Sequence, residues 1–137
     1  MKILKSLAAY MAVSHSLSTL DLRVNNIGSE GAKVLAPAIR DSHSLTECDL
    51  RQNKLGKEGW CAIFDALRDN PQNKITKWEL GGQGIDAEIA KSLAAYMAVS
   101  HSLTAADLHN NRLDDDAKQL VRECIRDRVA AGFDLKL

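Results

Sequence analysis

One peptide, KSLAAYMAVSHSL, occurs twice in this chain, at residues 5–17 and again without any change at residues 91–103. The two copies begin 86 residues apart in a chain of 137 residues. A fold that holds the same segment twice must offer it two equivalent positions, and stacked repeats offer such positions. The duplication therefore predicts an internal repeat.

Four segments share one apolar pattern, L-x-x-L-x-L-x-x-N-x-L, with a few departures. They read LSTLDLRVNNI from Leu17, LTECDLRQNKL from Leu45, ITKWELGGQGI from Ile75 and LTAADLHNNRL from Leu103. Their starts are 28, 30 and 28 residues apart, so the two copies of the peptide are separated by three units. The departures are Cys48, Trp78 and Ala106 in place of the second leucine and Gln83 in place of the asparagine.

The hydrophobic period changes within each unit. Around Leu20 and Leu22 apolar and polar residues alternate, as they do in a strand with one buried face. Leu35, Ala38 and Ile39 follow at the spacing of a helix face. Each unit is therefore predicted to be strand, turn, helix and turn, and neighbouring units stack because no single unit buries its own apolar faces. Helices are predicted over 5–16, 91–102 and about 115–130.

Several residues are expected to shape the ends of these elements. Pro37 lies within the expected helix of the first unit, where it should kink or shorten the helix unless it occupies the first turn. Asp114 or Asp115 should cap the helix of the fourth unit, and Gly132 should end it. The alternating sequence FDLKL then predicts a fifth strand over 133–137.

These segments resemble the leucine-rich repeat family, and the period of about 28 residues with a helical second half resembles its ribonuclease-inhibitor-like subtype. The resemblance implies an α/β fold, a right-handed solenoid with a parallel sheet of four to five strands on the concave side and helices on the convex side. It implies one domain over 1–137. Its parts are a half unit at 1–16, repeats at about 17–44, 45–74, 75–102 and 103–132, and a terminal strand at 133–137.

Residues 5–16 allow two interpretations. Lys2 and Lys5 flank a short apolar run, which is also the pattern of a secretory signal. The recurrence of the same peptide inside the chain favours a repeat helix instead. The residues of this first helix that are expected to point inward are Ile3, Leu7, Tyr10 and Met11.

The amino-acid composition disfavours several classes of function. Eighteen basic and eighteen acidic residues give no formal net charge, which disfavours nucleic acid and anionic membranes as partners. Aromatic residues make up 4% of the chain, too few for a base-stacking surface. The three cysteines, Cys48, Cys61 and Cys124, are interpreted as small core residues of a cytoplasmic protein.

Two motifs suggest cofactors, but the repeat explains both. Gly82, Gly84 and Ala87 have the G-x-G-x-x-A spacing of a dinucleotide-binding loop, yet they occupy the turn of the third repeat, where Gln83 should satisfy backbone groups. Three histidines, His15, His43 and His101, recur at one repeat position, where helix C-termini explain them better than a metal does. No cofactor, no metal and no enzyme activity are predicted.

The strand residues that point away from the core should form columns across the sheet, because parallel strands lie about 4.8 Å apart. The columns are Thr19, Glu47, Lys77 and Ala105; Asp21, Asp49, Glu79 and Asp107; and Arg23, Arg51, Gly81 and His109. An acidic column costs stability unless neighbouring charges offset it. Arginines can offset it in the first two repeats but not at Gly81, so Glu79 and Asp107 are expected to form an acid-rich end.

The predicted function is non-catalytic binding of a protein or peptide through this concave face. The expected contacts are Asp21, Arg23, Glu47, Asp49, Arg51, Lys77, Glu79, Asp107 and His109. Trp60 is a further candidate on the rim of the solenoid, because Ala32 and Ala90 occupy the equivalent position in the first and third repeats, whereas Trp78 should fill the core.

Two alternatives remain open. The family includes ribonuclease inhibitors, ligand-sensing regions of immune receptors and activators of small GTPases, so fold alone does not determine the role. By resemblance to the activators, the chain is a GTPase regulator that uses Arg23 or Arg51. In the other alternative it is a homo-oligomer that assembles through the open ends of the solenoid.

Overall fold

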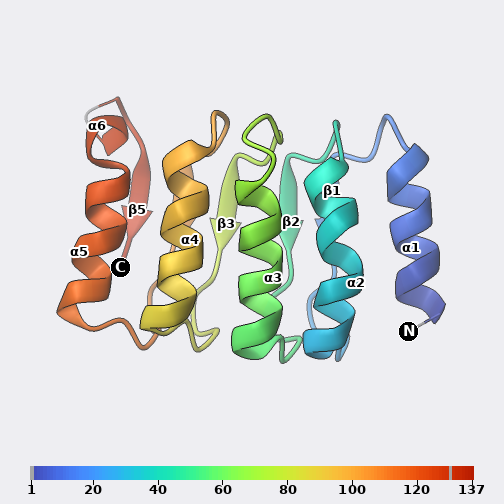
Figure 1. Cartoon of the computed structure of the whole chain (residues 1–137), viewed down its shortest axis with the longest axis horizontal. Helices are drawn as coiled ribbons and strands as arrows, with labels where there is room; N and C mark the ends of the chain where they lie inside the picture. Colours follow the sequence, from blue (N-terminus) through green and yellow to red (C-terminus); the bar gives the residue numbers. More distant parts are fainter. Residues whose placement is uncertain (1, 130) are drawn as a thin grey trace.

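Helices and strands alternate along the chain in the computed structural model, which describes residues 2–129 and 131–137 (Figure 1). The elements are α1 (Lys2–Val13), β1 (Thr19–Asp21), α2 (Gly28–Asp41), β2 (Glu47–Asp49), α3 (Gly56–Arg68), β3 (Lys77–Glu79), α4 (Ala87–Val99), β4 (Ala105–Asp107), α5 (Asp115–Cys124), α6 (Arg126–Val129) and β5 (Asp134–Lys136). Each of the first three repeats thus contains one strand followed by one helix, and in the fourth repeat the strand is followed by α5 and the short helix α6.

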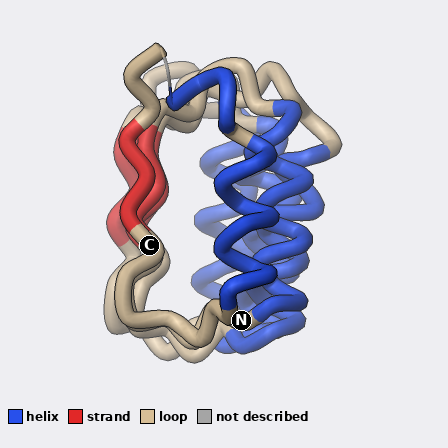
Figure 2. The backbone as a smooth tube through the Cα atoms, turned by 90° about the vertical axis from the view of Figure 1, so that its left-hand side faces the viewer, coloured by secondary structure: helices blue, strands red, loops and turns tan. Residues whose placement is uncertain are grey.

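The five strands form one parallel sheet in the order β1-β2-β3-β4-β5. Figure 2 shows the strands in one layer on the left and the helices in a second layer on the right. Thr19 pairs with Glu47 and Asp21 with Asp49, and β3 and β4 pair in the same register. The α/β solenoid and the columns expected from the sequence are therefore confirmed.

The middle residue of each repeat strand points into the space between the two layers. Leu20, Cys48, Trp78 and Ala106 are all buried, and together they form one row across the sheet. Leu50, Leu80 and Leu108 form a second buried row just after the strands, and Leu22 at the end of this row is half-buried. The core is thus continuous from one repeat to the next, as stacking requires.

An asparagine side chain joins neighbouring turns. The Nδ2 of Asn53 donates to the carbonyl oxygens of Leu22 (2.7 Å) and Leu50 (3.0 Å), which belong to different repeats. Its Oδ1 accepts from the backbone N–H of Asn25 at 2.6 Å. Since the side chain of Asn53 is buried, these bonds replace the water that the turn would otherwise need.

The glycine-rich turn of the third repeat follows the same plan. The Oε1 of Gln83 accepts from the backbone N–H of Gln52 (2.8 Å), and its Nε2 donates to the carbonyl oxygen of Gly81 (2.9 Å). Asn111 of the next repeat in turn accepts from the backbone N–H of Gln83 at 3.0 Å. The expectation that Gln83 satisfies backbone groups of a repeat turn is confirmed.

Helix ends differ in part from the sequence prediction. The side chain of Asp114 caps α5 by accepting from the N–H of Ala117 at 2.8 Å, as expected. The predicted helix over 115–130 is broken, because Ile125 leaves helical geometry at φ −123° and α6 follows as a separate short helix. Ala130, the predicted last residue, lies outside the described residues.

Pro37 neither shortens α2 nor lies in its first turn. The helix runs from Gly28 to Asp41, with Pro37 well inside it. Pro37 is exposed, so its ring points away from the core, while the buried residues Ala36 and Ala38 beside it keep the helix packed. Tertiary packing here offsets the loss of one backbone hydrogen bond.

Trp60 is buried, so the prediction that it lies on the rim is wrong. Only 2% of its surface is exposed, and its ring stacks on Phe64 with the centroids 5.6 Å apart. Trp78 meets both rings edge-on, at 6.4 Å from Trp60 and 5.5 Å from Phe64. The large side chain fits because it fills the space between adjacent repeats, and Trp78 occupies the core as predicted.

The inward set predicted for α1 is wrong at two residues. Met11 is buried and Leu7 is half-buried, but Ile3 is 82% exposed and Tyr10 is 52% exposed. In α4, which carries the same peptide, Tyr96 is completely buried. The difference arises because α4 packs between α3 and α5, whereas α2 is the one helix that packs extensively on α1 within the described residues.

The cysteines are free thiols, and none of the described helices is long and apolar enough to span a bilayer. Cys48 is buried as predicted, and burial raises the pKa of its thiol far above the usual range. Cys61 and Cys124 are only half-buried, and partial burial raises the pKa of the Cys124 thiol to about 11. Reactive thiolates are therefore disfavoured at Cys48 and Cys124.

Candidate functional site

The concave face of the sheet collects all nine contact residues predicted on the strands. They project from β1 to β4 and from the turns that follow, on the side away from the helices, as the register of the strands requires. Each is exposed or half-exposed. The structure thus brings together residues that are up to 88 positions apart in the sequence, from Asp21 to His109.

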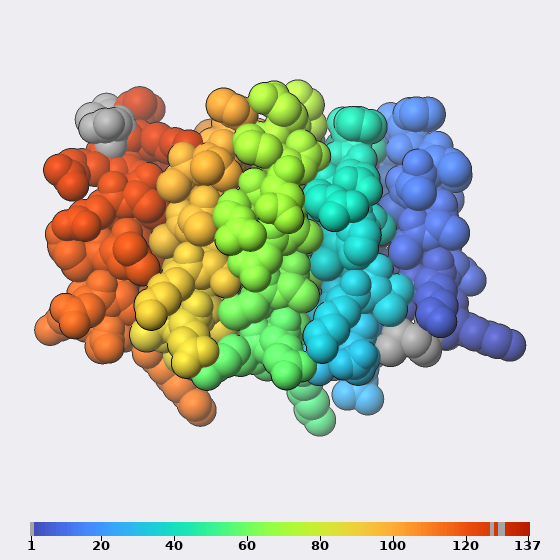
Figure 3. Space-filling view, viewed as in Figure 1, coloured from blue at the N-terminus to red at the C-terminus, as the bar shows by residue number. Residues whose placement is uncertain are grey.

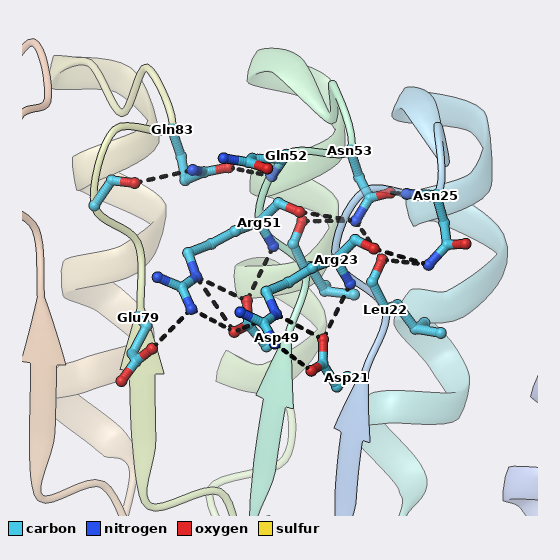
Figure 4. A network of polar contacts seen from close by, with 12 residues as sticks. Asp21, Leu22, Arg23, Asn25, Asp49, Arg51, Gln52, Asn53, Glu79 and Gln83 are labelled. Atoms are coloured by element: carbon cyan, nitrogen blue, oxygen red, sulfur yellow. Dashed lines mark hydrogen bonds and ion pairs between the residues drawn. The ribbon is translucent and has the colours of Figure 1, made fainter.

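Arg23 begins a chain of alternating charges on this face (Figure 4). Its Nε and NH2 groups donate to the two carboxylate oxygens of Asp21 at 2.9 and 2.8 Å, which is a bidentate pair. The same Nε lies 3.6 Å from Oδ2 of Asp49 on the neighbouring strand. Arg23 therefore separates two members of the acidic column.

Arg51 continues the chain across the next pair of strands. Its Nε and NH2 bind Asp49 at 3.0 and 2.7 Å, and NH2 also lies 3.0 Å from the carboxylate of Glu79. Glu79 in turn lies 3.2 Å from Nζ of Lys77. We call this set the charge ladder, and its members are Asp21, Arg23, Asp49, Arg51, Glu79 and Lys77.

The ladder corrects the prediction of an acid-rich end at Glu79 and Asp107. Glu79 has two cationic partners, because Arg51 reaches it from the neighbouring strand although its own repeat has Gly81 at the arginine position. Asp107 lies 2.6 Å from Nδ1 of His109. Pairs between repeats depend on the register of the sheet, which the composition of a single repeat does not reveal.

Gly81 makes room for His109. A Cβ atom at residue 81 would lie 2.8 Å from Nδ1 of His109, so the imidazole occupies the space that an arginine side chain fills in the first two repeats. The backbone N–H of His109 also donates to Asp107 at 3.1 Å. In the third and fourth repeats the imidazole of His109 therefore fills this part of the face over both residue 81 and residue 109.

Hydrogen bonds and ion pairs hold these carboxyl groups in their charged forms. The Arg23 guanidinium hydrogen-bonded to Asp21 lowers the pKa of that carboxyl below its usual value, and Asp21 raises the pKa of Arg23 in return. Burial alone would raise the pKa of Asp107, but hydrogen bonds from His109 and the charge of Lys136 outweigh it and lower the pKa. The carboxyl groups of Asp21 and Asp107 are therefore held in their charged forms near neutral pH.

A hollow of about 280 Å³ lies over β1, β2 and β3. Its lining includes every member of the charge ladder together with Glu47 and Thr19. Asp49 and Arg51 are the least exposed of the ladder side chains, at 21% and 28%, and they lie at its centre. Glu47 is exposed and has no ion-pair partner among the residues described, so it adds one uncompensated charge beside the hollow.

Sequence reasoning missed two members of the face. Asp134 pairs with Ala105, and Lys136 pairs with Asp107, so β5 extends two of the predicted columns. The signal was available, because aligning FDLKL with the other strands puts these residues at the same positions. Lys136 ends the acidic column with a basic residue, which lowers the charge repulsion at Asp107.

Residues 2–129 and 131–137 contain no cluster of three or more side chains suited to a metal ion. His15, His43 and His101 are exposed at the ends of three helices and do not form such a cluster. The concave face carries charged side chains of both signs, and ion pairs hold them in place.

Residues 13–36 match the family model described as Leucine Rich repeat. The fold is an α/β solenoid with a five-stranded parallel sheet, an architecture consistent with leucine-rich repeats. Leucine-rich repeats generally mediate protein–protein interaction and are typically non-catalytic modules. No curated protein matches the chain.

Proposed function

We propose that this α/β solenoid is a non-catalytic module that binds a protein or peptide of mixed charge through its concave face. The observation that carries the proposal is the hollow over β1 to β3, whose lining contains the whole charge ladder. Bidentate pairs fix the orientation of Arg23 and Arg51, so less side-chain entropy is lost when a partner binds.

The dimensions of the face favour a macromolecular partner over a small molecule. The hollow is shallow and charged, whereas pockets for small molecules are mostly apolar and enclose the ligand. Five strands at about 4.8 Å spacing give a face roughly 20 Å across, which is wide enough for a peptide or a protein loop. Charges of both signs on the face call for both signs on the partner.

Arg51 is the expected centre of the contact. It lies in the middle of the hollow, is 28% exposed and binds carboxylates on two strands. Arginine residues near the centre of an interface often carry a large share of the binding energy. The surrounding residues, including Glu47, Lys77, Asp107 and His109, then set specificity and orientation.

Regulation of a small GTPase remains the second candidate and has less support. A regulator that supplies an arginine to a GTPase needs a guanidinium group that is available to the partner. In both Arg23 and Arg51 the guanidinium is bound by the aspartate two residues earlier. We also propose, from the period of about 28 residues alone, the ribonuclease-inhibitor-like subtype, and from the free cysteines a cytoplasmic location.

Affinity capture from native lysate with three forms of the chain tests the binding proposal. The first is wild type, and the second is Glu79→Lys with Asp107→Lys on the concave face. The matched control is Glu58→Lys with Glu88→Lys, which makes the same change in charge at two exposed helix residues. We expect at least one protein that wild type and the control retain and the concave variant loses. If the concave variant and wild type retain the same proteins, the concave face is not the contact.

A further inference from the structure

One end of the solenoid presents an apolar stripe that nothing in the described chain covers. Ile3, Leu7 and Tyr10 of α1 recur at i, i+4 and i+7, and Ile3 and Tyr10 are largely exposed. We call these three residues the α1 stripe. In Figure 1 α1 lies at one end of the row of helices and α5 at the other.

The second copy of the peptide shows how this stripe behaves when it is covered. Ile89 and Tyr96 of α4 correspond to Ile3 and Tyr10, and both are buried. Tyr96 stacks on Phe64 of the preceding helix with ring centroids 6.2 Å apart, and its hydroxyl accepts a hydrogen bond from Trp78 at 3.0 Å. The same side chains thus pack well against an apolar neighbour.

The opposite end of the solenoid is built differently. The helix positions that face the next unit hold Ala32 and Ala36 in α2 and Trp60 and Phe64 in α3, all of them buried. The corresponding residues of α5 are Lys118 and Arg122, which are half-exposed and exposed. Figure 3 shows α1 and α5 at the two extremes of the molecule, with α2, α3 and α4 packed between them. A polar surface therefore covers the α5 end, whereas the α1 end is apolar.

The difference between the apolar α1 end and the polar α5 end determines which contact between two copies of the chain is favourable. Head-to-tail stacking would bury Lys118 and Arg122 against the α1 stripe and bring them towards Lys2 and Lys5 of the next copy. Buried cations without partners and like charges in proximity both oppose such a contact. A two-fold contact between α1 ends avoids both costs and forms a closed dimer.

We propose that the α1 stripe binds the α1 stripe of a second copy, with the two helices antiparallel. Antiparallel pairing places Lys2 and Lys5 of each helix beside the C-terminal end of the other, where the helix dipole favours positive charge. It also places the two apolar stripes face to face along their whole length. This dimer contact is independent of the proposed concave-face function, since it leaves the sheet of both copies open.

Sedimentation equilibrium of the 137-residue chain, from about 1 µM to about 1 mM, tests the proposal. The variants are Ile3→Glu with Tyr10→Glu at the α1 end and, as a control on the surface of α5, Leu120→Glu, where Leu120 is 38% exposed. We expect wild type to reach a dimer and not to exceed it. We expect the α1 variant to weaken dimerisation at least about a hundredfold and Leu120→Glu to leave it unchanged. Circular dichroism of each variant confirms that the fold is retained, since all three sites are exposed.

Three results would overturn the proposal. The first is a monomer at every concentration. The second is a dimer that the α1 variant does not weaken. The third is a mass that grows beyond the dimer, which would indicate head-to-tail stacking.

Discussion

The indole nitrogen of Trp78 donates a hydrogen bond to the hydroxyl of Tyr96 at 3.0 Å, and both side chains are fully buried. The bond connects β3 to α4 within one repeat. Burial raises the pKa of the Tyr96 hydroxyl well above its usual value, so it stays neutral. Tyr10 lies in an identical peptide but is 52% exposed. It therefore serves as an internal control for the contribution of the Trp78–Tyr96 hydrogen bond to stability.

Tyr96→Phe should lower the free energy of unfolding by about 1–3 kcal/mol, because it leaves the buried N–H of Trp78 without an acceptor. Tyr10→Phe, the matched change in the identical peptide, should have nearly no effect. Urea unfolding followed by circular dichroism measures both. Equal losses in the two variants would mean that the Trp78 bond does not account for the difference between the two tyrosines.

Asn53→Ala should destabilise the chain by at least about 2 kcal/mol, because several backbone groups of two repeats lose a buried partner. Asn25→Ala is the control, since Asn25 is exposed and its side chain donates to carbonyl oxygens of its own turn. We expect a markedly smaller loss for Asn25→Ala in the same urea experiment. A similar loss for both would show that the contact between repeats adds little.

Trp60→Ala should cost about 3–5 kcal/mol, because it leaves a cavity between Phe64 and Trp78. Trp60→Phe should cost clearly less, since most of the volume remains. Thermal and urea unfolding of the two variants check this order. A stability close to wild type for Trp60→Ala would instead support the rim position that sequence reasoning suggested.

Asp86→Ala should destabilise the chain by about 1 kcal/mol at neutral pH, because Asp86 caps α4 by accepting from the N–H of Ile89 at 3.0 Å. This hydrogen bond lowers the pKa of Asp86 below its usual value of 3.8. A group with a lowered pKa in the folded state stabilises the fold above its usual pKa and loses that effect as the pH falls through the lowered value. The difference in the free energy of unfolding between wild type and variant should therefore be constant from pH 5 to 8 and should disappear below about pH 4. A gap that widens in acid would contradict this assignment.

The sequence predicted the repeat and the columns because aligning the four segments puts equivalent residues at equivalent positions of each strand. Leu20 and Leu22, for example, show the strand alternation directly. The sequence-based prediction of burial failed at Trp60, Ile3 and Tyr10, because the burial of these side chains depends on the neighbouring repeat. Trp60 has a neighbour on the side it faces, whereas the α1 stripe does not within the described chain.

In the candidate site too, the local sequence pattern predicted where residues lie but not which of them form contacts. The positions of Asp49, Arg51 and Glu79 on one face follow from alternation alone. The pairing of Arg51 with Glu79 does not, because it requires the distance between two residues that are 28 positions apart in the sequence and belong to neighbouring repeats. The continuation of α2 through Pro37 also depends on tertiary packing, which a local pattern does not encode.

The most direct test of the concave-face claim is hydrogen–deuterium exchange of the chain with and without a captured partner. Segments 19–25, 47–53, 77–83 and 105–109 carry the columns and their turns. We predict that the partner slows exchange in these segments and leaves α2, α3 and α4 unchanged. Slowed exchange confined to the helices, with unchanged strands, would contradict the account.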